Sequence, residues 1–273
     1  MTDQYAVIGN PIAQSKSPLI HATFAEMTGQ DMVYGRILGA VGDFVGAVDQ
    51  FRAAGGSGMN ITTPFKLDAA RYADVVSQRV QLSGAANALK FDGDHVHADN
   101  FDGIGLIRDV LDNLRCPLAG KRVLLLGAGG AARGALLPLL EQVPAELVIA
   151  NRTLSKAQEL AAATASRVDV RASSYADLVG QTFDVVFNAT SASLRDELPA
   201  VPASALANCH LAYEFAYGRG LTPFLSLAKE ARAQRLADGV GMLVEQAAEV
   251  FHWWRGVRPL TRDLIHTLMI ELR

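Results

Sequence analysis

The sequence contains a lysine and an aspartate whose surroundings suit them to proton transfer. Lys66 follows the stretch GMNITTPF, in which Thr63 and Pro64 are typical of the N-cap and the first position of a helix. A cation in that first turn opposes the helix dipole by roughly 0.3–1 kcal/mol, so its placement indicates a function. Asp102, in ADNFDGIGLI, is either the N-cap of the next helix or the partner of Lys66. If the two side chains meet, they form a pair that donates and accepts a proton.

Three side chains near these positions are suited to hold a small polar ligand. Asn60 and Thr62 lie two residues apart on an expected strand, so both point to the same side. Asn87, in GAANALK, is either a further ligand or an ordinary loop amide. We therefore expect a polar site around Lys66.

Polar residues also occur where one helix begins and where another is buried. Ser15 and Ser17 precede a helix whose first turn contains Pro18. Ser17 is typical of an N-cap, whereas the two hydroxyls together would suit the carboxylate of a substrate. Gln246 borders the apolar face of a helix expected over residues 241–254, where a polar side chain needs a partner from the protein or a substrate.

The stretch VLLLGAGGAARGALLPLL has the pattern of a dinucleotide-binding turn. An apolar strand leads into Gly127, Gly129 and Ala132, the spacing G-x-G-x-x-A, and a helix follows from about residue 130 to 142. Glycines at such a turn let the backbone approach a pyrophosphate at the helix N-terminus. The alternative is a turn that only joins a strand to a helix. The residues expected to contact the cofactor here are Gly127, Ala128, Gly129, Gly130 and Ala131.

The next strand ends on residues that favour NADP over NAD. Its last apolar residues are followed by Asn151, Arg152 and Thr153, with Lys156 close behind. An NAD site usually places an acid here to accept from the ribose 2′-OH, whereas a 2′-phosphate needs donors and positive charge. A guanidinium with an amide, a hydroxyl and an ammonium nearby fits the phosphate. The alternative is a pair of solvated charges with Thr153 or Ser155 as a helix cap.

The elements that must position these residues alternate between strands and helices along nearly the whole chain. Apolar strands of the second half suit a parallel sheet covered on both faces. The C-terminal third is expected to be helical over residues 222–234, 241–254 and 259–272. The expected strands are residues 5–9, 32–38, 57–62, 86–91 and 95–99 in a first series, and residues 121–127, 145–151, 167–172, 183–190 and 209–215 in a second.

This rhythm predicts an α/β fold of two domains, the second built on a Rossmann-like, doubly wound parallel sheet. We assign residues 1–103 to a substrate-binding catalytic domain and residues 104–237 to an NADP-binding domain. Residues 238–273 are expected to be helices that pack back on the first domain. A cleft is expected between the halves.

Composition excludes several classes of partner. The net charge of −3 over 273 residues, from 25 basic and 28 acidic side chains, gives no excess that would attract nucleic acid. Cys116 and Cys209 are the only cysteines and form no CxxC, which fits a reducing compartment. His95 and His97 form the one close histidine pair, and no ligand set completes a metal site around them. Without an apolar run long enough to span a membrane, we expect a cytoplasmic protein with a small-molecule substrate, as a monomer or homodimer.

Taken together, these motifs resemble shikimate dehydrogenases over essentially the whole chain. The resemblance implies reversible, NADPH-dependent reduction of 3-dehydroshikimate to shikimate on the pathway to chorismate and the aromatic amino acids. The matching motifs are SKSP (15–18), GMNITTPFK (58–66), GAANAL (84–89), DNFDGIG (99–105), GAGGAARG (127–134), NRT (151–153), NATS (188–191) and DGVGMLVEQAA (238–248).

The resemblance also assigns roles to individual positions. Lys66 would handle the proton beside Asp102, and the hydroxyls of Ser15 and Ser17 would hold the substrate carboxylate. The positions expected to contact the substrate ring or its substituents are Asn60, Thr62, Asn87, Asp102, Tyr217 and Gln246. The further cofactor positions are Thr190, with Phe215, Gly239 and Met242 beside the nicotinamide.

The chain departs from the family pattern at three places. Phe101 stands next to Asp102 where the family usually has threonine, which could alter packing and substrate preference. Ala88 replaces the usual threonine after Asn87, and YGRGLTPF over residues 217–224 differs from the common Asn-Pro loop. None of these changes touches Lys66 or Asp102.

Two other functions remain open on the sequence alone. A quinate/shikimate dehydrogenase with relaxed cofactor use would share the fold, although the paired serines and the basic NRT segment favour shikimate and NADP. A non-catalytic NADP sensor would keep the glycine turn and Arg152, but it has no need for Lys66 and Asp102.

Overall fold

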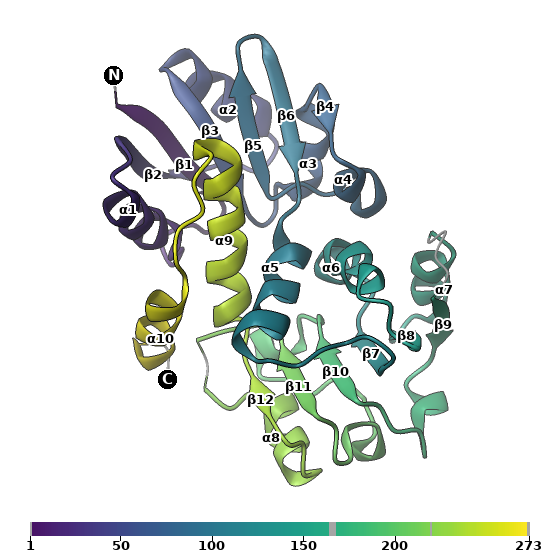
Figure 1. Cartoon of the computed structure of the whole chain (residues 1–273). Helices are drawn as coiled ribbons and strands as arrows, with labels where there is room; N and C mark the ends of the chain where they lie inside the picture. Colours follow the sequence, from purple (N-terminus) through teal and green to yellow (C-terminus); the bar gives the residue numbers. More distant parts are fainter. Residues whose placement is uncertain (1, 164–167, 219, 272–273) are drawn as a thin grey trace. The chain divides into compact units, whose positions relative to one another are not determined.

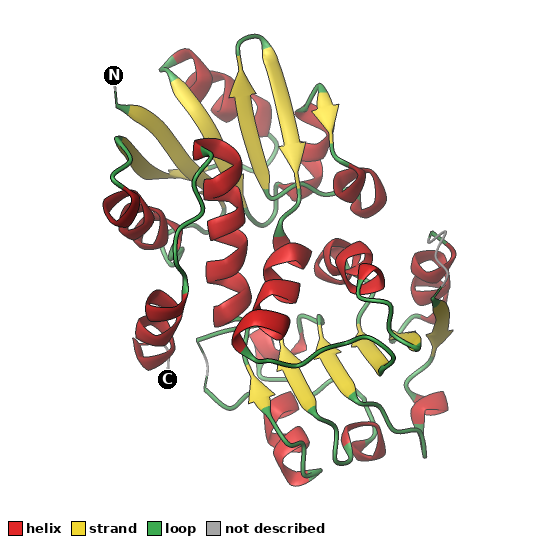
Figure 2. Ribbon diagram, viewed as in Figure 1, coloured by secondary structure: helices red, strands yellow, loops and turns green. Residues whose placement is uncertain are grey.

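A computed structural model describes residues 2–163, 168–218 and 220–271 (Figure 1). The chain divides into two compact units. Unit 1 comprises Met1–Asp102 with Val244–Leu264, and unit 2 comprises Gly103–Leu243 with Ile265–Arg273. Each unit has one six-stranded sheet with helices on its faces (Figure 2), which confirms the two-domain α/β fold.

The sheet of unit 1 is mixed and has the order β2-β1-β3-β5-β6-β4. Strands β1, β2 and β3 are parallel, whereas β5 runs antiparallel to both β3 and β6. Strand β4 is two residues long and was not expected from the sequence. The strands are β1 (Asp3–Gly9), β2 (Met32–Leu38), β3 (Gly56–Ile61), β4 (Val75–Val76), β5 (Ala88–Asp92) and β6 (His95–Asp99).

Helices of unit 1 bury the apolar residues that alternate along its strands. One cluster includes Ile8, Met59, Ile61 and Phe65, all buried. The long helix α9 (Val240–Arg255) begins in unit 2 and ends in unit 1, because the division falls between Leu243 and Val244. The other helices here are α1 (Ser17–Thr28), α2 (Phe44–Ala53), α3 (Lys66–Tyr72) and α4 (Gln78–Ser83), and α10 (Arg262–Glu271) also crosses the division.

The sheet of unit 2 is parallel throughout and has the order β12-β11-β10-β7-β8-β9. Numbered from its first strand, this is the 3-2-1-4-5-6 order of a dinucleotide-binding sheet, which confirms the expected Rossmann-like domain. The two-residue strand β12 was not expected from the sequence. The strands are β7 (Arg122–Leu126), β8 (Glu146–Ala150), β9 (Asp169–Ser173), β10 (Val185–Asn188), β11 (Leu211–Glu214) and β12 (Leu236–Ala237).

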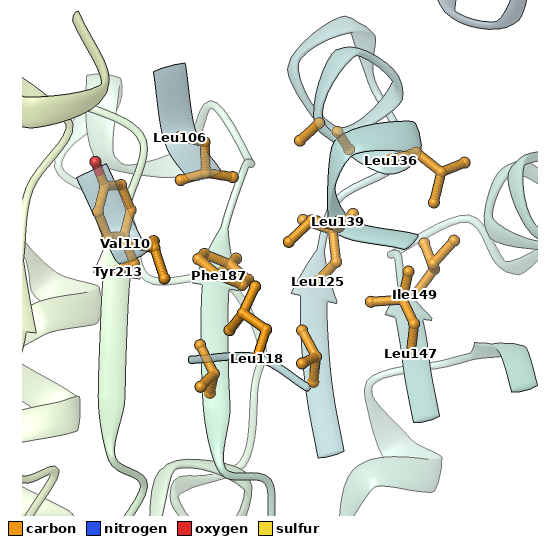
Figure 3. Close-up of a cluster of buried hydrophobic side chains, with 14 of the residues drawn as sticks. Leu106, Val110, Leu118, Leu125, Leu136, Leu139, Leu147, Ile149, Phe187 and Tyr213 are labelled. Atoms are coloured by element: carbon orange, nitrogen blue, oxygen red, sulfur yellow. The ribbon is translucent and has the colours of Figure 1, made fainter. Parts of the chain in front are cut away.

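Both faces of this sheet are covered by apolar packing. Val123 and Leu125 of β7 belong to one buried cluster, part of which Figure 3 shows, while Leu124 and Leu126 belong to another. A strand that is buried on both faces reads as a continuous apolar run, which is why VLLL was recognisable. The helices and helical turns of unit 2 are α5 (Asp102–Arg108), a π-turn (Asp109–Asn113), α6 (Gly130–Glu141), α7 (Leu154–Ala162) and α8 (Pro223–Glu230), with short 3-10 turns at Ala176–Leu178, Ala192–Arg195 and Ala203–Leu206.

Two expectations about helix starts are wrong. Thr63 and Pro64 lie in a turn closed by the hydrogen bond from Phe65 N–H to the Thr62 carbonyl (3.0 Å), so helix α3 begins only at Lys66. Ser17 is the first helical residue of α1, and Lys16 occupies the N-cap position without a side-chain capping hydrogen bond. The spacing of Ser/Thr-Pro pairs thus located both helices but misplaced their caps.

Candidate active site

Lys66 and Asp102 meet in unit 1. Nζ of Lys66 lies 2.5 Å from Oδ2 of Asp102, and Oδ1 of Asp102 accepts a 2.8 Å hydrogen bond from Nδ2 of Asn87. Both carboxylate oxygens are therefore used by side chains. The N–H of Asp102 donates to Oδ1 of Asn100 at 3.1 Å, so Asp102 is itself held at the helix start and is not its N-cap.

The exposure of the pair is unequal. The Lys66 side chain is 31% exposed, against 14% for Asp102. Lys66 is therefore the more accessible member of the pair, and the carboxylate orients its ammonium. A charge-assisted contact of this kind fixes the ammonium more strongly than a neutral hydrogen bond would.

Asn87 connects the pair to three other parts of unit 1. Its Nδ2 also donates to Oε1 of Gln246 on α9 at 3.1 Å, and its Oδ1 accepts from the N–H of Phe101 at 2.9 Å. Its carbonyl accepts from Nδ2 of Asn60 at 3.3 Å. All of Asn87, Asn60 and Gln246 are buried, so these bonds satisfy amides that would otherwise be costly.

Tyr34 is a member of this network that sequence reasoning missed. Its hydroxyl, on β2, donates to Oδ1 of Asn60 at 2.7 Å. Burial raises the pKa of Tyr34, which keeps the hydroxyl protonated as a donor, and the Ser17 hydroxyl opposes that rise. The sequence MVYGRIL gave no signal for it, because a tyrosine is common in any half-buried strand.

The serine segment before α1 forms a local turn. The N–H of Ser17 donates to Oγ of Ser15 at 3.3 Å, and a guanidinium nitrogen of Arg36 donates to the Ser15 carbonyl at 2.8 Å. Ser17 is buried, whereas Ser15 is half-buried. Thr62 follows β3 directly, with its N–H bound to the Ile8 carbonyl at 3.0 Å, so it lies on the same sheet as Asn60.

The ring of Phe101 packs against Trp253 and Arg79. Its ring centroid lies 5.4 Å from that of Trp253, and the guanidinium of Arg79 lies 5.5 Å from the ring centroid. Because Asn87 is held by the backbone N–H at position 101, that contact does not depend on which side chain stands there.

A cavity of about 610 Å³ lies at the carboxyl ends of the strands of unit 2. The turn from Gly127 to Ala131 lines it, and helix α6 begins there at Gly130. Gly127 has φ +103°, and an added Cβ would lie 3.3 Å from the Ala189 carbonyl, so a side chain would be strained and crowded. Cβ atoms added at Gly129 and Gly130 would meet nothing within 4 Å, which leaves open space before the helix N-terminus.

The basic residues after β8 line the same cavity. Asn151, Arg152, Thr153 and Lys156 all face it, together with Thr190. Thr153 occupies the N-cap position of α7, but its hydroxyl makes no capping hydrogen bond. The alternative in which the Thr153 side chain caps helix α7 is therefore wrong.

Sequence reasoning missed further residues that line this cavity. Arg195 and Glu197 form an ion pair of 2.9 Å, and Tyr175 lines the cavity with them. Arg195 and then Arg152 lower the pKa of Glu197, so a carboxylate faces the three cations of the cavity. Arg195 ends the 3-10 turn Ala192–Arg195 and Glu197 follows it, and no motif marks these residues.

The remaining candidates lie in unit 2 apart from this cavity lining. Phe215 and Tyr217 follow β11, whereas Gly239 and Met242 follow β12. An added Cβ at Gly239 would lie 2.2 Å from the Phe215 carbonyl oxygen, so these two loops touch. Tyr217 thus belongs to unit 2, whereas the other substrate candidates belong to unit 1.

The part of the chain that the structure describes contains neither a metal-binding cluster of side chains nor a membrane-spanning helix. Over residues 2–163, 168–218 and 220–271, no group of three or more His, Cys, Asp or Glu side chains is placed to hold a metal ion. Over the same residues, no helix combines the length and the apolar character needed to cross a membrane.

Comparison with known proteins covers both halves of the chain. The family model described as shikimate dehydrogenase substrate binding domain matches residues 7–89, and the one described as shikimate / quinate 5-dehydrogenase matches residues 110–198. A protein of Nitrosospira multiformis named shikimate dehydrogenase (NADP(+)) is 54% identical over 272 residues, covering 100% of this chain and 99% of the relative.

Solved structures agree over the full length. The crystal structure of an Ael1 enzyme from Pseudomonas putida is 59% identical with a TM-score of 0.96, covering 99% of this chain and 100% of that chain. A shikimate dehydrogenase solved in complex with NADP+ is 28% identical with a TM-score of 0.87, covering 100% and 96%. With this identity and coverage, the chain belongs to the shikimate dehydrogenase family.

Proposed function

We propose that this protein catalyses the reversible NADPH-dependent reduction of 3-dehydroshikimate to shikimate. The observation that carries the proposal is the contact of 2.5 Å between Lys66 and Asp102 beside a set of buried amides. An NADP sensor would need the cavity of unit 2 but not a partly exposed lysine whose ammonium is oriented by a carboxylate. Family membership supports the same choice.

Lys66 is the proton-handling group in this proposal. On reduction, its ammonium donates a proton to the carbonyl oxygen of the substrate, and on oxidation the neutral amine takes that proton back from the hydroxyl. Asp102 holds the ammonium in position, and Asn87 fixes Asp102 in turn. NADPH supplies the hydride when it is bound.

The buried amides and the serine segment are proposed to bind the acid. Amide groups of Asn60, Asn87 and Gln246 already lie within hydrogen-bond distance of one another or of Asp102 and Tyr34. A ring that carries several hydroxyls needs donors and acceptors held in place, which such a network provides. Ser15 and Ser17 are proposed to hold the carboxylate, with Thr62 and Tyr217 as further substrate contacts.

The cavity of unit 2 fits NADP in its shape and its donor set. Open space lies before Gly129 and Gly130, where backbone N–H groups of α6 suit a pyrophosphate. Arg152 and Lys156 provide positive charge for a 2′-phosphate. The proposed cofactor residues are Gly127, Ala128, Gly129, Gly130, Ala131, Asn151, Arg152, Thr153, Lys156, Thr190, Phe215, Gly239 and Met242.

These assignments extend to the organisation and setting of the protein. Residues 1–103 are proposed to bind the substrate, residues 104–237 to bind NADP, and residues 238–273 to return to the first domain. We further propose a cytoplasmic enzyme that acts as a monomer or homodimer.

A spectrophotometric assay tests the function directly. The purified protein is mixed with shikimate and NADP+, and reduced nicotinamide is followed by its absorbance. Matched reactions contain quinate, and a second pair contains NAD+. Faster turnover with shikimate and NADP+ supports the proposal, a higher rate with quinate would favour a quinate dehydrogenase, and no turnover in any mixture would favour a sensor.

A further inference from the structure

Tyr213 of β11 carries a buried hydroxyl that joins two distant parts of unit 2. It donates to Oδ2 of Asp109 at 2.7 Å and accepts from the backbone N–H of Met242 at 3.2 Å. Tyr213 is fully buried and Asp109 is buried. We propose that Tyr213 and Asp109 are positioning residues that hold residues 238–242, the turn before helix α9 and the first residues of that helix, in place to receive the nicotinamide half of NADP.

The strand order indicates that this turn faces the nicotinamide half. In an open parallel sheet a dinucleotide binds outside the carboxyl ends of the strands, across the point where the strand order reverses. Here that point lies between β7 and β10. The basic cavity residues Arg152 and Lys156 lie on the β8 side, which assigns the adenosine half to that side. The other half then extends toward β10, β11 and β12, and the turn 238–242 follows β12 directly.

The hydroxyl of Tyr213 accepts from an N–H group in the first turn of helix α9, as a side-chain cap would. Helix α9 begins at Val240, so the residue before it is Gly239, which has no side chain to accept from the first helical N–H groups. Oδ1 of Asp238 accepts from the Val240 N–H at 3.3 Å, and Tyr213 accepts from that of Met242. The start of α9 is therefore held from a neighbouring strand.

Asp109 determines which way the Tyr213 hydroxyl points. The backbone N–H of Met242 can only donate, so the Tyr213 oxygen accepts there and its proton faces Oδ2 of Asp109. Nδ2 of Asn113 donates to the other oxygen of Asp109 at 3.0 Å. Burial, followed by the nearby Asp109, raises the pKa of Tyr213 well above its ordinary value, so the phenol keeps its proton.

Close packing shows that the turn rests directly on these residues. An added Cβ at Gly241 would lie 2.0 Å from Oδ1 of Asp109, so only glycine allows the approach. In Figure 3 the Tyr213 ring lies beside Val110, with its hydroxyl directed away from the packed leucines. The ring is thus fixed in the apolar cluster, while its hydroxyl oxygen accepts the hydrogen bond from the Met242 N–H.

Tyr213 could act by positioning residues 238–242 or only by stabilising unit 2 as a whole. The binding of two ligands distinguishes these two roles. NADP+ reaches both halves of the site, whereas adenosine 2′,5′-bisphosphate carries the adenosine and its 2′-phosphate but no nicotinamide. If residues 238–242 lose their position, only the binding of NADP+ should weaken. If unit 2 is destabilised as a whole, the binding of both ligands should weaken.

The test is Tyr213→Phe, measured by isothermal titration calorimetry with each ligand. Loss of one buried hydrogen bond at the turn should weaken NADP+ binding roughly five- to tenfold and leave adenosine 2′,5′-bisphosphate within about twofold. Tyr5→Phe is the matched control, because Tyr5 is also buried and its hydroxyl accepts from Arg255 in unit 1. Equal weakening of both ligands, or no change in either, would overturn the proposal.

A second variant covers the case in which Tyr213→Phe does not fold. Asp109→Asn keeps the shape of the side chain but offers the tyrosine a poorer acceptor, and the same selective loss is expected from it. Of the proposed function, the inference requires only that the protein binds NADP. If the unsubstituted protein binds NADP+ but does not oxidise shikimate, the proposed function fails while this comparison still decides the role of Tyr213.

Discussion

Asp102 lies between Lys66 and Asn87, giving one carboxylate oxygen to the ammonium at 2.5 Å and the other to the amide at 2.8 Å. The ammonium is thus oriented by a group that is itself fixed. Since Lys66 is the more exposed member, it is the group that contacts the reacting oxygen in the proposed reaction.

Lys66→Met should lower kcat far more than it raises KM for shikimate. A positioned acid–base group contributes typically 10²- to 10⁴-fold, so a fall in kcat of that order is expected. Steady-state kinetics with saturating NADP+ measures the split. Lys229→Met, which removes an exposed lysine of α8, is the control. A variant with intact kcat and a raised KM would show that Lys66 binds and does not transfer a proton.

Arg152→Ala should lower the preference for NADP+ over NAD+. The guanidinium lines the cavity on the side assigned to the adenosine, where a 2′-phosphate needs positive charge. We expect the ratio of kcat/KM for the two cofactors to fall by about tenfold or more, equivalent to roughly 1.4 kcal/mol. Arg232→Ala, an exposed position outside the cavity lining, should leave the ratio unchanged. An unchanged ratio in Arg152→Ala would contradict the assignment.

Glu197→Gln should raise the same preference. Glu197 pairs with Arg195 at 2.9 Å, and Arg195 and Arg152 lower the pKa of Glu197. Glu197 therefore stays a carboxylate in a cavity that we propose binds an anion. Removing that charge should favour NADP+ by roughly threefold at low salt, with a smaller effect at high salt because exposed charges are screened. Glu159→Gln on α7 is the matched control outside the cavity lining. A fall in preference would mean that Glu197 assists the phosphate.

His21 should make the protein less stable in acid. It is fully buried, and its ring stacks on Tyr34 with centroids 4.3 Å apart. Burial lowers its pKa from 6.5 to about 3. Between pH 6.5 and pH 3, His21 is therefore protonated in the unfolded chain but neutral in the folded chain. The free energy of unfolding falls as the pH drops through this range, by up to about 1.4 kcal/mol per pH unit.

Urea unfolding of His21→Phe between pH 7 and pH 5 measures this effect. The variant should show a flatter loss of stability on acidification, because the titrating ring is gone. Phe24→Leu, at a buried position in the same cluster, should shift stability by an amount independent of pH. Identical slopes in His21→Phe and the parent protein would refute the role of His21.

Phe101→Thr should reduce stability but spare the reaction. Removing a buried ring that packs on Trp253 costs about 2–4 kcal/mol, as large-to-small core changes usually do. Asn87 is held by the backbone N–H of residue 101, so kcat with shikimate should stay within about threefold. Thermal unfolding and steady-state kinetics measure the two effects. A large change in the ratio of shikimate to quinate rates would instead make the ring a determinant of specificity.

Features written in local sequence were predictable. The glycine turn was expected at residues 127–131, and the structure places these residues around the cavity of unit 2. The strand VLLL was expected because burial on both faces leaves a continuous apolar run. Short strands such as β4 and β12 were missed, because two residues carry no periodicity.

Features that depend on long-range pairing were not predictable in the same way. Tyr34 reaches Asn60 only because β1 pairs with both β2 and β3, and the register of those strands is a property of the whole sheet. Arg195 and Glu197 reach the cavity through a loop without a motif. The caps at Thr63 and Ser17 were wrong because turn geometry, not residue type, decided where each helix begins.

Helix α9 has a consequence for how such an enzyme can evolve. Met242, in the segment proposed to receive the nicotinamide, and Gln246, which accepts a hydrogen bond from Asn87, are four residues apart on one continuous helix, a separation of about 6 Å along its axis. The two compact units therefore cannot be exchanged as independent modules by recombination at their boundary, since a crossover between Leu243 and Val244 would join two foreign halves of a single helix. Cofactor preference and substrate preference in this lineage are expected to drift by point substitution and to be inherited together.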